Sequence, residues 1–499
     1  MVMKRKIVLG LFTALIMSLH AAGQNKLLDR NFWKSNPSIE KIKSLVAEGN
    51  DPSDLNRYSF DALSWALLEK ADSNILEYLL SQKGNSVNKL THDGRTYIFW
   101  AAYSDNLSFM KSLHAKGADM SIVDEHGYSL LTFTAVTGNK NQDIYNFIID
   151  KGAKPKTETN RDGANSLLLL LPFLNSNEMI NYFNLHGLDL GDTDQHGATA
   201  AHYASKGGNT ELLKSLKTKG VDYKGIDNKG RTTAHYAAMS IRGKKTNPKI
   251  LEFLKEEGVN LWAKAKNGQS ALGILAQGNA DSTSIHYLIE NGCNVFDLPE
   301  TGRSAFMSLT TKWKVKQLSK FEPTKDIINC QNNKGETAVL LAAKHNSPEV
   351  LRYLFETGGD PHVTDKKNKP IQEYVLEGYR AISVADFTEK VSLLKEVNLD
   401  FNTPLSGENT IFHWVVKKAK LELLDILTPI TDNIDVLNQD GLTALHLAAM
   451  TASSMDPVKK LLSLGASKDI TTSFDETPLE LALQNEKLKG FEDFLKELL

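Results

Sequence analysis

The segment Asn438-Gln-Asp-Gly-Leu-Thr-Ala-Leu-His-Leu-Ala-Ala449 decides the fold of this chain of 499 residues. Gly441 predicts a tight turn, because glycine adopts left-handed backbone conformations without steric cost. Thr443 is a candidate N-cap for the short helix that follows, and the closing alanines let a neighbouring helix approach closely. The same pattern occurs at 194–204 and at 227–238. The chain therefore contains an internal repeat that begins with a turn and a short helix.

The turn glycine recurs at a nearly constant interval. Successive turn glycines are 33 to 38 residues apart, at Gly94, Gly127, Gly163, Gly197, Gly230, Gly268, Gly302 and Gly335. The series starts upstream at Ser59 and continues at Asn368, Gly407, Gly441 and Asp475. A fixed period of this size indicates a solenoid rather than a set of separate globular domains.

A second helix is predicted about ten residues after the first, at the apolar spacing i, i+3, i+4 that marks an amphipathic helix. Val350, Leu351 and Leu354 show this spacing in one repeat, and Val458, Leu461 and Leu462 show it in another. Each unit then closes on a glycine and a small or polar residue. The complete unit is thus a turn followed by two helices.

These features resemble the ankyrin-repeat family, whose repeat of about 33 residues is a turn followed by two antiparallel helices. Its Thr-Pro-Leu-His-x-Ala signature corresponds here to Thr443-Ala-Leu-His-Leu-Ala448, Thr199-Ala-Ala-His-Tyr-Ala204 and Thr232-Thr-Ala-His-Tyr-Ala237. The nearest match to its proline is Thr477-Pro-Leu-Glu-Leu-Ala482. The resemblance covers roughly residues 30–499. It implies an all-α ankyrin-repeat solenoid that binds other proteins.

The expected array has a cap at each end. Residues 24–56 form the expected N-terminal cap or first partial repeat, because 33–56 show only a second-helix pattern. The ankyrin-repeat array follows at 57–471, and a C-terminal capping repeat at 472–499. Three units depart from the pattern. They are 161–193, with a leucine run and Pro172; 299–331, with lysines at the start of the second helix; and 365–403, without the turn glycine or the signature histidine.

Residues 1–23 are expected to be a signal peptide. Lys4, Arg5 and Lys6 form a basic start, a run of 13 uncharged residues follows at 7–19, and small residues precede the expected cleavage after Gly23. This order is typical of secretory signals, and the uncharged run is short for a bilayer-spanning helix. We therefore expect an exported protein, periplasmic or secreted, with no stable membrane insertion after cleavage. An uncleaved N-terminal anchor is the alternative.

The charge balance excludes one class of partner. The chain has 58 basic and 60 acidic residues and a net charge of -2, whereas a nucleic-acid-binding protein usually shows a clear basic excess. Loss of the expected signal peptide would make the remaining chain more acidic. We therefore expect no nucleic-acid binding.

The residues of the repeated signature are expected to be structural. Thr199, Thr232 and Thr443 are candidate N-caps, and the resemblance implies that the histidines three residues later tie neighbouring turns together. The aromatic residues near the signature histidine position are expected in the core between repeats, at Trp65, Trp100, Tyr203, Tyr236 and Trp414.

No spacing in the sequence predicts catalysis, a cofactor or a metal. Nucleophile, phosphate-loop and zinc-protease motifs are missing. His126 and His196 directly precede their turn glycines, and His92 lies close to this register, two residues before Gly94. Neighbouring repeats lie too far apart for a shared metal with ligand bonds near 2 Å. Cys293 and Cys330 lie at different places in the period, so we expect two free thiols, with a disulfide as the alternative.

The predicted partner-binding surface lies on the turn tips of the central repeats. The tips change from acidic residues and histidine to mostly basic residues, and three closing segments carry a large aromatic residue. Aromatic and arginine side chains are typical interface anchors. The predicted partner-binding residues are Tyr223, Lys229, Arg231, Trp262, Lys266, Phe296, Arg303 and Lys334. The alternative is a solvated basic edge whose aromatic residues pack on neighbouring turns.

These observations favour a non-enzymatic scaffold that works as a monomer and binds another protein, one with an acidic surface, on the concave face of the central repeats. A second hypothesis is a small-molecule or cell-wall glycan binder that stacks sugars on Tyr223, Trp262 and Phe296. A third is an enzyme with a site in the concave groove, which no residue spacing supports.

Overall fold

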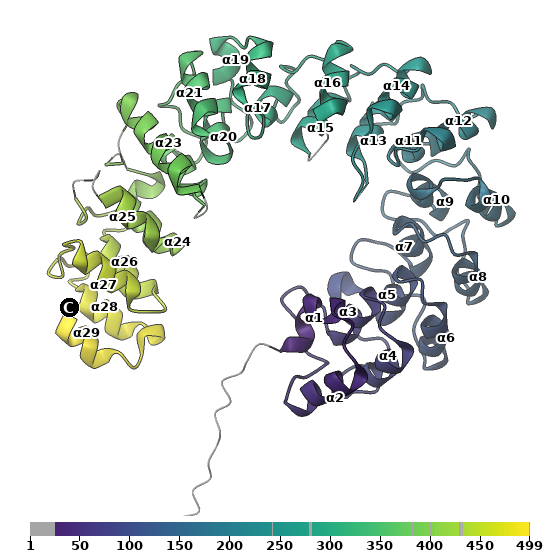
Figure 1. Ribbon diagram of the computed structural model, residues 1–499, viewed down its shortest axis with the longest axis horizontal. Coiled ribbons are helices and arrows are strands. Elements are labelled where there is room, and N and C mark those ends of the chain that lie inside the picture. Colours follow the sequence, from purple (N-terminus) through teal and green to yellow (C-terminus); the bar gives the residue numbers. More distant parts are fainter. Residues whose placement is uncertain are drawn as a thin grey trace, which may run out of the picture. The chain divides into compact units, whose positions relative to one another are not determined.

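Each repeat folds as a turn followed by two antiparallel helices (Figure 1). The computed structural model describes residues 25–241, 243–278, 282–380, 383–399, 401–402, 404–428, 431 and 433–498. The expected signal peptide, residues 1–23, lies outside them. The chain divides into two units, Met1–Val221 and Asp222–Leu499, and each is described by itself.

The first unit begins with α1 (Arg30–Lys34) and α2 (Ile39–Ala47), which precede the regular repeats. Short 3-10 helices occur at η1 (Lys26–Leu28), η2 (His92–Gly94) and η3 (Leu171–Phe173). The first helices of its repeats are α3 (Ala62–Leu68), α5 (Tyr97–Tyr103), α7 (Leu130–Val136), α9 (Ser166–Leu170) and α11 (Ala200–Ser205). The second helices are α4 (Ser73–Leu80), α6 (Leu107–Ala115), α8 (Gln142–Asp150), α10 (Glu178–Leu185) and α12 (Thr210–Thr218).

The second unit continues the same alternation. Its first helices are α13 (Thr233–Met239), α15 (Ala271–Gln277), α17 (Ala305–Leu309), α20 (Ala338–His345), α22 (Ile371–Glu377), α24 (Ile411–Lys418), α26 (Ala444–Thr451) and α28 (Pro478–Gln484). The segments after them are α14 (Pro248–Glu256), α16 (Ser282–Glu290), α18 (Val315–Leu318), η4 (Ser319–Phe321), α19 (Lys325–Asn329), α21 (Pro348–Glu356), α23 (Val384–Glu396), η7 (Leu421–Leu423), α25 (Leu424–Leu427), α27 (Asp456–Ser463) and α29 (Glu492–Leu498). Two further 3-10 helices are η6 (Ser406–Glu408) and η9 (Glu486–Leu488).

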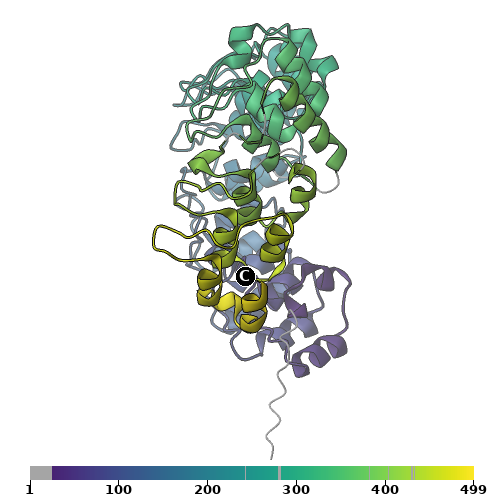
Figure 2. The same cartoon turned by 90° about the vertical axis from the view of Figure 1, so that its left-hand side faces the viewer.

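The described residues confirm an all-α solenoid. They contain isolated β-bridges at four turns, such as Ile226 with Thr232, but no strands. Within the same residues, no helix is both long enough and apolar enough to cross a membrane. In Figure 2 the turns of the teal and green repeats extend to one side of their helices.

Short polar side chains start the first helices. Asp61 accepts the backbone N–H of Ser64 at 2.8 Å, and Asn165 accepts that of Leu168 at 3.0 Å. These bonds satisfy N–H groups that have no partner within the helix. The helices are short and packed on nearly all sides, so helix propensity alone would not hold them. Their stability comes from burial between neighbouring repeats.

Asparagines after the first helices connect one repeat to the preceding one. The Asn139 amide donates to the carbonyl oxygen of Ala102 at 2.9 Å, and the Asn485 amide donates to that of Ala449 at 2.9 Å. Each acceptor lies in the last turns of a first helix, where carbonyl groups lack intrahelical partners. The stack is thus joined by polar bonds as well as by apolar packing.

Gly207 shows how closely neighbouring repeats approach. A Cβ atom at this position would lie 2.1 Å from the carbonyl oxygen of Pro172 in the preceding repeat. A Cβ atom at Gly378 would likewise lie 2.3 Å from the carbonyl oxygen of Lys344. Only glycine fits such a contact without a shift of the backbone.

The irregular repeats depart from the pattern where the sequence predicts. Helix α9 ends at Leu170 and continues as η3, which contains Pro172. In the repeat at 299–331 the single second helix is replaced by α18, η4 and α19. Asn368 takes the place of the turn glycine with φ 57°, which asparagine tolerates better than most residues.

Candidate functional site

The turn tips of the central repeats are joined by a continuous set of backbone hydrogen bonds, which we call the tip ladder. In each pair of neighbouring tips, the carbonyl oxygen of the residue before the first turn glycine accepts a backbone N–H from the second tip, with an N–O distance of 2.9 Å. The four bonds run from Lys266 to Lys229, from Glu300 to Asn267, from Asn333 to Thr301 and from Lys366 to Lys334. The tips therefore form an ordered edge in the second unit.

The turn glycines make the tip ladder possible in two ways. Gly230, Gly268, Gly302 and Gly335 have φ between 69° and 80°, a region that other residues rarely adopt. A Cβ at Gly335 would also lie 2.5 Å from the backbone nitrogen of Lys366 in the next tip. Replacement would strain the turn and separate the two tips.

A buried side chain fixes the shape of several tips. Asp227 Oδ1 accepts the backbone N–H groups of Lys229 at 2.9 Å and Arg231 at 2.8 Å. Burial alone would raise the pKa of Asp227, but hydrogen bonds from the Arg231 backbone, the Arg231 side chain and Tyr236 lower it. In the same way, Asn332 Oδ1 accepts the backbone N–H of Lys334 at 2.8 Å. The tips are ordered before any partner arrives.

Three of the predicted basic residues are available to a partner. The side chains of Lys229, Lys266 and Lys334 are exposed, and none forms an ion pair with the residues that the structure describes. They lie on consecutive or nearby tips of the same ladder. These three amines form the basic part of the surface.

The two predicted arginines are instead bound within their own repeats. Arg231 Nε donates to Asp227 Oδ2 at 2.6 Å, and its guanidinium lies 4.8 Å from the centre of the Tyr236 ring. Arg303 Nε donates to Ser308 Oγ at 3.0 Å. Both side chains are half-buried, so their main role is to stabilise their own turns rather than to contact a partner.

The three aromatic residues differ in exposure. Trp262 is 56% exposed and Phe296 is half-buried, with its ring centre 5.4 Å from that of Phe306. Tyr223 is only 2% exposed and packs edge-on against Phe253, which corrects the expectation of an exposed side chain. Burial raises the pKa of its hydroxyl.

The register of the closing segment explains this correction. Tyr223 lies three residues after the closing Gly220, whereas Trp262 lies four residues after Gly258. The residues at the third position after the next two closing glycines, Leu261 and Val295, are also buried. In these repeats the third position is buried, whereas the fourth is exposed at Trp262 and half-buried at Phe296.

Two exposed apolar residues were not among the residues predicted from the sequence. Ile226 is 65% exposed and Leu298 is 51% exposed. Each lies four residues before its turn glycine, on the repeats before and after the one that carries Trp262. This common offset was the signal that could have revealed them. Together with Trp262 they add apolar surface beside the lysines.

The signature residues have the expected structural roles. The Nδ1 atom of His235 accepts the backbone N–H of Thr232 at 3.1 Å, and its Nε2 lies 2.9 Å from the carbonyl oxygen of Gln269 in the next repeat. His413 connects to Leu442 similarly, at 2.7 Å. The five aromatic residues expected in the core are all buried, namely Trp65, Trp100, Tyr203, Tyr236 and Trp414.

A family model described as ankyrin repeats (3 copies) matches residues 63–159, 171–265, 243–365 and 412–499. The chain belongs to the ankyrin-repeat family. Ankyrin repeats are scaffolds for protein–protein interaction.

Similar proteins match only part of this ankyrin-repeat chain. An ankyrin repeat protein of Fowlpox virus (strain NVSL) is 31% identical over 29% of this chain and 42% of its own length. Neurogenic locus notch homolog protein 1 of Homo sapiens is 26% identical over 31% of this chain and 6% of its own length. The B-cell lymphoma 3 protein homolog of Mus musculus is 29% identical over 30% of this chain and 32% of its own length. The chain thus spans less than half the length of these curated relatives.

A solved structure also matches. It is described as the Bd0816 predatory endopeptidase from Bdellovibrio bacteriovorus in complex with immunity protein Bd3460. The matching chain is 26% identical, with a TM-score of 0.32, over 39% of this chain and 96% of that chain.

The histidines considered for metal binding lie beside carboxylate groups. His126 Nε2 lies 3.2 Å from Asp93 Oδ2, and His92 Nε2 lies 3.4 Å from the same oxygen. His196 instead faces Asp162, at 3.4 Å. No cluster of three or more potential metal ligands occurs among the described residues.

The two cysteines of this ankyrin-repeat chain are free thiols. Cys293 is buried, and its Sγ lies 3.4 Å from the carbonyl oxygen of Leu261. Burial raises the pKa of this thiol to about 11, so it stays protonated at neutral pH.

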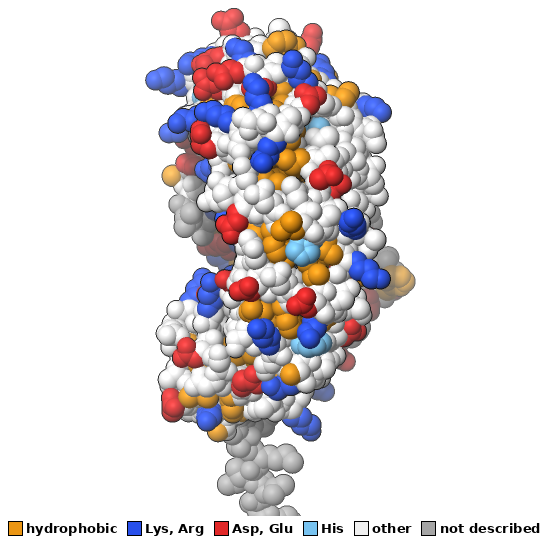
Figure 3. Space-filling view, turned by 90° about the vertical axis from the view of Figure 1, so that its right-hand side faces the viewer, with side chains coloured by type: hydrophobic (Ala, Val, Ile, Leu, Met, Phe, Trp, Pro, Cys, Tyr) orange, Lys and Arg blue, Asp and Glu red, His pale blue; other side chains and the backbone are white. Residues whose placement is uncertain are grey.

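The second helices present a different surface. Figure 3 shows the face that α8, α10 and α12 occupy on the right-hand side of Figure 1. Acidic and basic side chains are interspersed there, with small apolar areas between them. A mixed surface of this kind is typical of a solvated face.

Proposed function

We propose that this ankyrin-repeat chain is a non-enzymatic scaffold in an exported compartment, and that the concave surface of its central repeats binds a partner protein with an acidic surface. The signal-peptide pattern of residues 1–23 supports export to the periplasm or beyond. The scaffold acts as a monomer. N-terminal sequencing of the exported protein should begin at Gln24.

The observation that carries the interface is the combination of order and exposure along the tip ladder. Lys229, Lys266 and Lys334 present amines that form no ion pair with the described residues, on backbone that is already fixed. Trp262 adds a large exposed ring. An ordered surface loses little conformational entropy on binding, which favours affinity. Charge of one sign steers a partner of the opposite sign.

The glycan-binding alternative has weaker support. A stacking platform needs several exposed aromatic rings in a row, but Tyr223 is buried and Phe296 is half-buried. Of these three aromatic residues, only Trp262 is mostly exposed. Protein binding uses Trp262, the lysines and the apolar residues Ile226 and Leu298 together.

The test is a variant that combines Lys229→Glu, Lys266→Glu and Lys334→Glu with Trp262→Ala. Crosslinking in the native cell envelope followed by mass spectrometry identifies what the unaltered protein captures. We expect the variant to lose that capture, because both the charge and the apolar anchor are gone.

The matched control reverses three exposed lysines on second helices, with Lys111→Glu, Lys249→Glu and Lys395→Glu. This control has the same change in net charge and should retain the partner. Equal capture by the tip variant and the unaltered protein would refute the proposed surface.

A further inference from the structure

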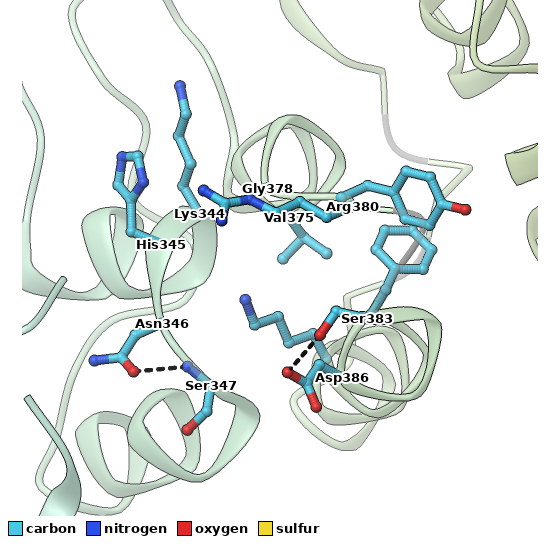
Figure 4. A pocket seen from close by; sticks show the side chains of 12 residues that line it. Lys344, His345, Asn346, Ser347, Val375, Gly378, Arg380, Ser383 and Asp386 are labelled. Atoms are coloured by element: carbon cyan, nitrogen blue, oxygen red, sulfur yellow. Dashed lines mark hydrogen bonds between the residues drawn. The ribbon is translucent and has the colours of Figure 1, made fainter. Parts of the chain in front are cut away.

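A cationic pocket of about 230 Å³ lies between two neighbouring repeats, at the end of the helices opposite the turn tips. Its walls come from the C-terminal ends of α20 and α22 and from the N-terminal ends of α21 and α23 (Figure 4). Lys344, Arg380 and Lys390 line it, and Asp386 is the carboxylate in its lining. Cationic side chains therefore predominate.

Lys390 is an unusual residue for a second helix. It is only 6% exposed, and its Nζ donates to the carbonyl oxygen of Ala343 at 2.9 Å. In other repeats an asparagine such as Asn139 makes the corresponding bond to the preceding first helix. An amide would satisfy this carbonyl without a charge, so the bond alone does not require an ammonium group.

The charge of Lys390 is poorly compensated by the protein. Burial lowers the pKa of its amine to about 8, and the nearby Asp386 only partly offsets this effect. Asp386 is itself exposed and accepts a hydrogen bond from Ser383 Oγ at 2.9 Å. An ammonium group has three donors, and Ala343 provides the one acceptor found among the described residues.

Arg380 adds a second cation at the mouth of the pocket. Its side chain is exposed, and Figure 4 shows it extending towards Lys344 and His345. Partial burial and the cations Lys344, Arg303 and Arg380 lower the pKa of His345, and Glu336 partly offsets this effect. Lys344 is paired with Glu377 at 2.7 Å, so Arg380 and Lys390 are the cations available to a ligand.

We propose that this pocket binds a small oxyanion of the phosphate class, held by the ammonium group of Lys390 and the guanidinium group of Arg380. Ser347 and Ser383, the N-cap residues of α21 and α23, line the same space, and the positive dipole end of a helix favours an anion. Arginine and lysine are the usual partners of phosphate groups. The site lies away from the tip ladder, so its ligand does not compete with a partner protein there.

The experiment is isothermal titration of the mature full-length protein with inorganic phosphate, and in parallel with glycerol phosphate, at low ionic strength. Unaltered protein should bind with saturation. Arg380→Gln and Lys390→Met should each weaken binding by about tenfold or more, the effect of losing a charge-assisted hydrogen bond. Lys249→Gln removes an exposed lysine from another second helix and should leave binding unchanged.

Preference for inorganic phosphate would identify the free ion as the ligand, and preference for the ester would identify a phosphate group on a larger molecule. If Lys390→Met does not fold, as judged by circular dichroism, Arg380→Gln decides, because its side chain is exposed and supports no described contact. Absence of saturable binding, or equal binding by Arg380→Gln and the unaltered protein, would overturn the proposal.

Discussion

The signature histidines act as neutral connectors between repeats. In His235 and His413, Nδ1 accepts a backbone N–H, so the proton must reside on Nε2, which faces a carbonyl oxygen of the next repeat. Burial lowers the pKa of His235, His413 and His446. A second proton on Nδ1 would break the bond that starts the helix.

Stability should therefore fall in mild acid. The folded pKa of each histidine lies below its unfolded value of about 6.5, so the unfolded chain binds more protons as the pH drops. The stabilisation is complete above the unfolded pKa and is lost as the pH falls towards the folded pKa. Urea unfolding between pH 7.5 and pH 5 should show a decreasing free energy of unfolding.

A triple variant with His235→Gln, His413→Gln and His446→Gln provides the control. Glutamine can also accept the backbone N–H of a helix N-cap residue, but it does not titrate. The variant should show a smaller slope of stability against pH. An unchanged slope would show that other groups cause the pH dependence.

Some properties of single residues at the site can be predicted from the sequence, and others cannot. The burial of Tyr223 could have been predicted from the sequence, because it lies three residues after its closing glycine and the later repeats carry the apolar Leu261 and Val295 at the same distance. The bonds of Arg231 to Asp227 and of Arg303 to Ser308 were not readable. They depend on rotamers within a turn, and a sequence pattern does not specify those.

At the scale of elements, the tip ladder turns separate loops into one ordered edge. Each of the three middle tips contributes one acceptor and one donor from the backbone, so the order extends from one turn to the next. Loops at a surface are usually more mobile than helices. The three middle loops are held at both sides.

Hydrogen exchange should reveal the tip ladder directly. The amides of Lys266, Glu300 and Asn333 donate along it and should exchange slowly for loop residues. The neighbouring amides of Asn267 and Thr301 have no backbone acceptor among the described residues and should exchange quickly. Equal exchange rates within each tip, measured by NMR, would argue against a formed ladder.

Element boundaries were predictable where a glycine or proline enforced them. The turn glycines and the break at Pro172 follow from backbone sterics, and they appear in the structure as expected. The division of the second helix at 299–331 into α18, η4 and α19 was predictable only as an irregularity. The apolar spacing there is too weak to fix where each short helix begins.

At the scale of the whole molecule, the period of the sequence predicts one repeat array, whereas the length of the chain alone would predict several globular domains. Contacts join each repeat to the next, and stability in such arrays is close to a sum of repeat and interface contributions. The described structure separates into units at Val221 and Asp222. Each unit has its own buried core.

The fragments 25–221 and 222–499 should therefore each fold when expressed separately. Both should keep the helical circular dichroism of the intact chain and unfold cooperatively in urea. As a comparison, a cut within a repeat, between α13 and α14, should reduce the helical signal, because it separates two helices that pack together. Loss of helical signal in either designed fragment would contradict this prediction.

The backbone origin of the tip ladder has a consequence for how this protein changes over evolutionary time. Its bonds use main-chain atoms, so most substitutions at the non-glycine tip positions leave them in place. Mutations can then alter recognition with little loss of folding stability. A gene with this property can acquire new partners by substitutions at a few tip codons, while the helices that hold those tips stay the same.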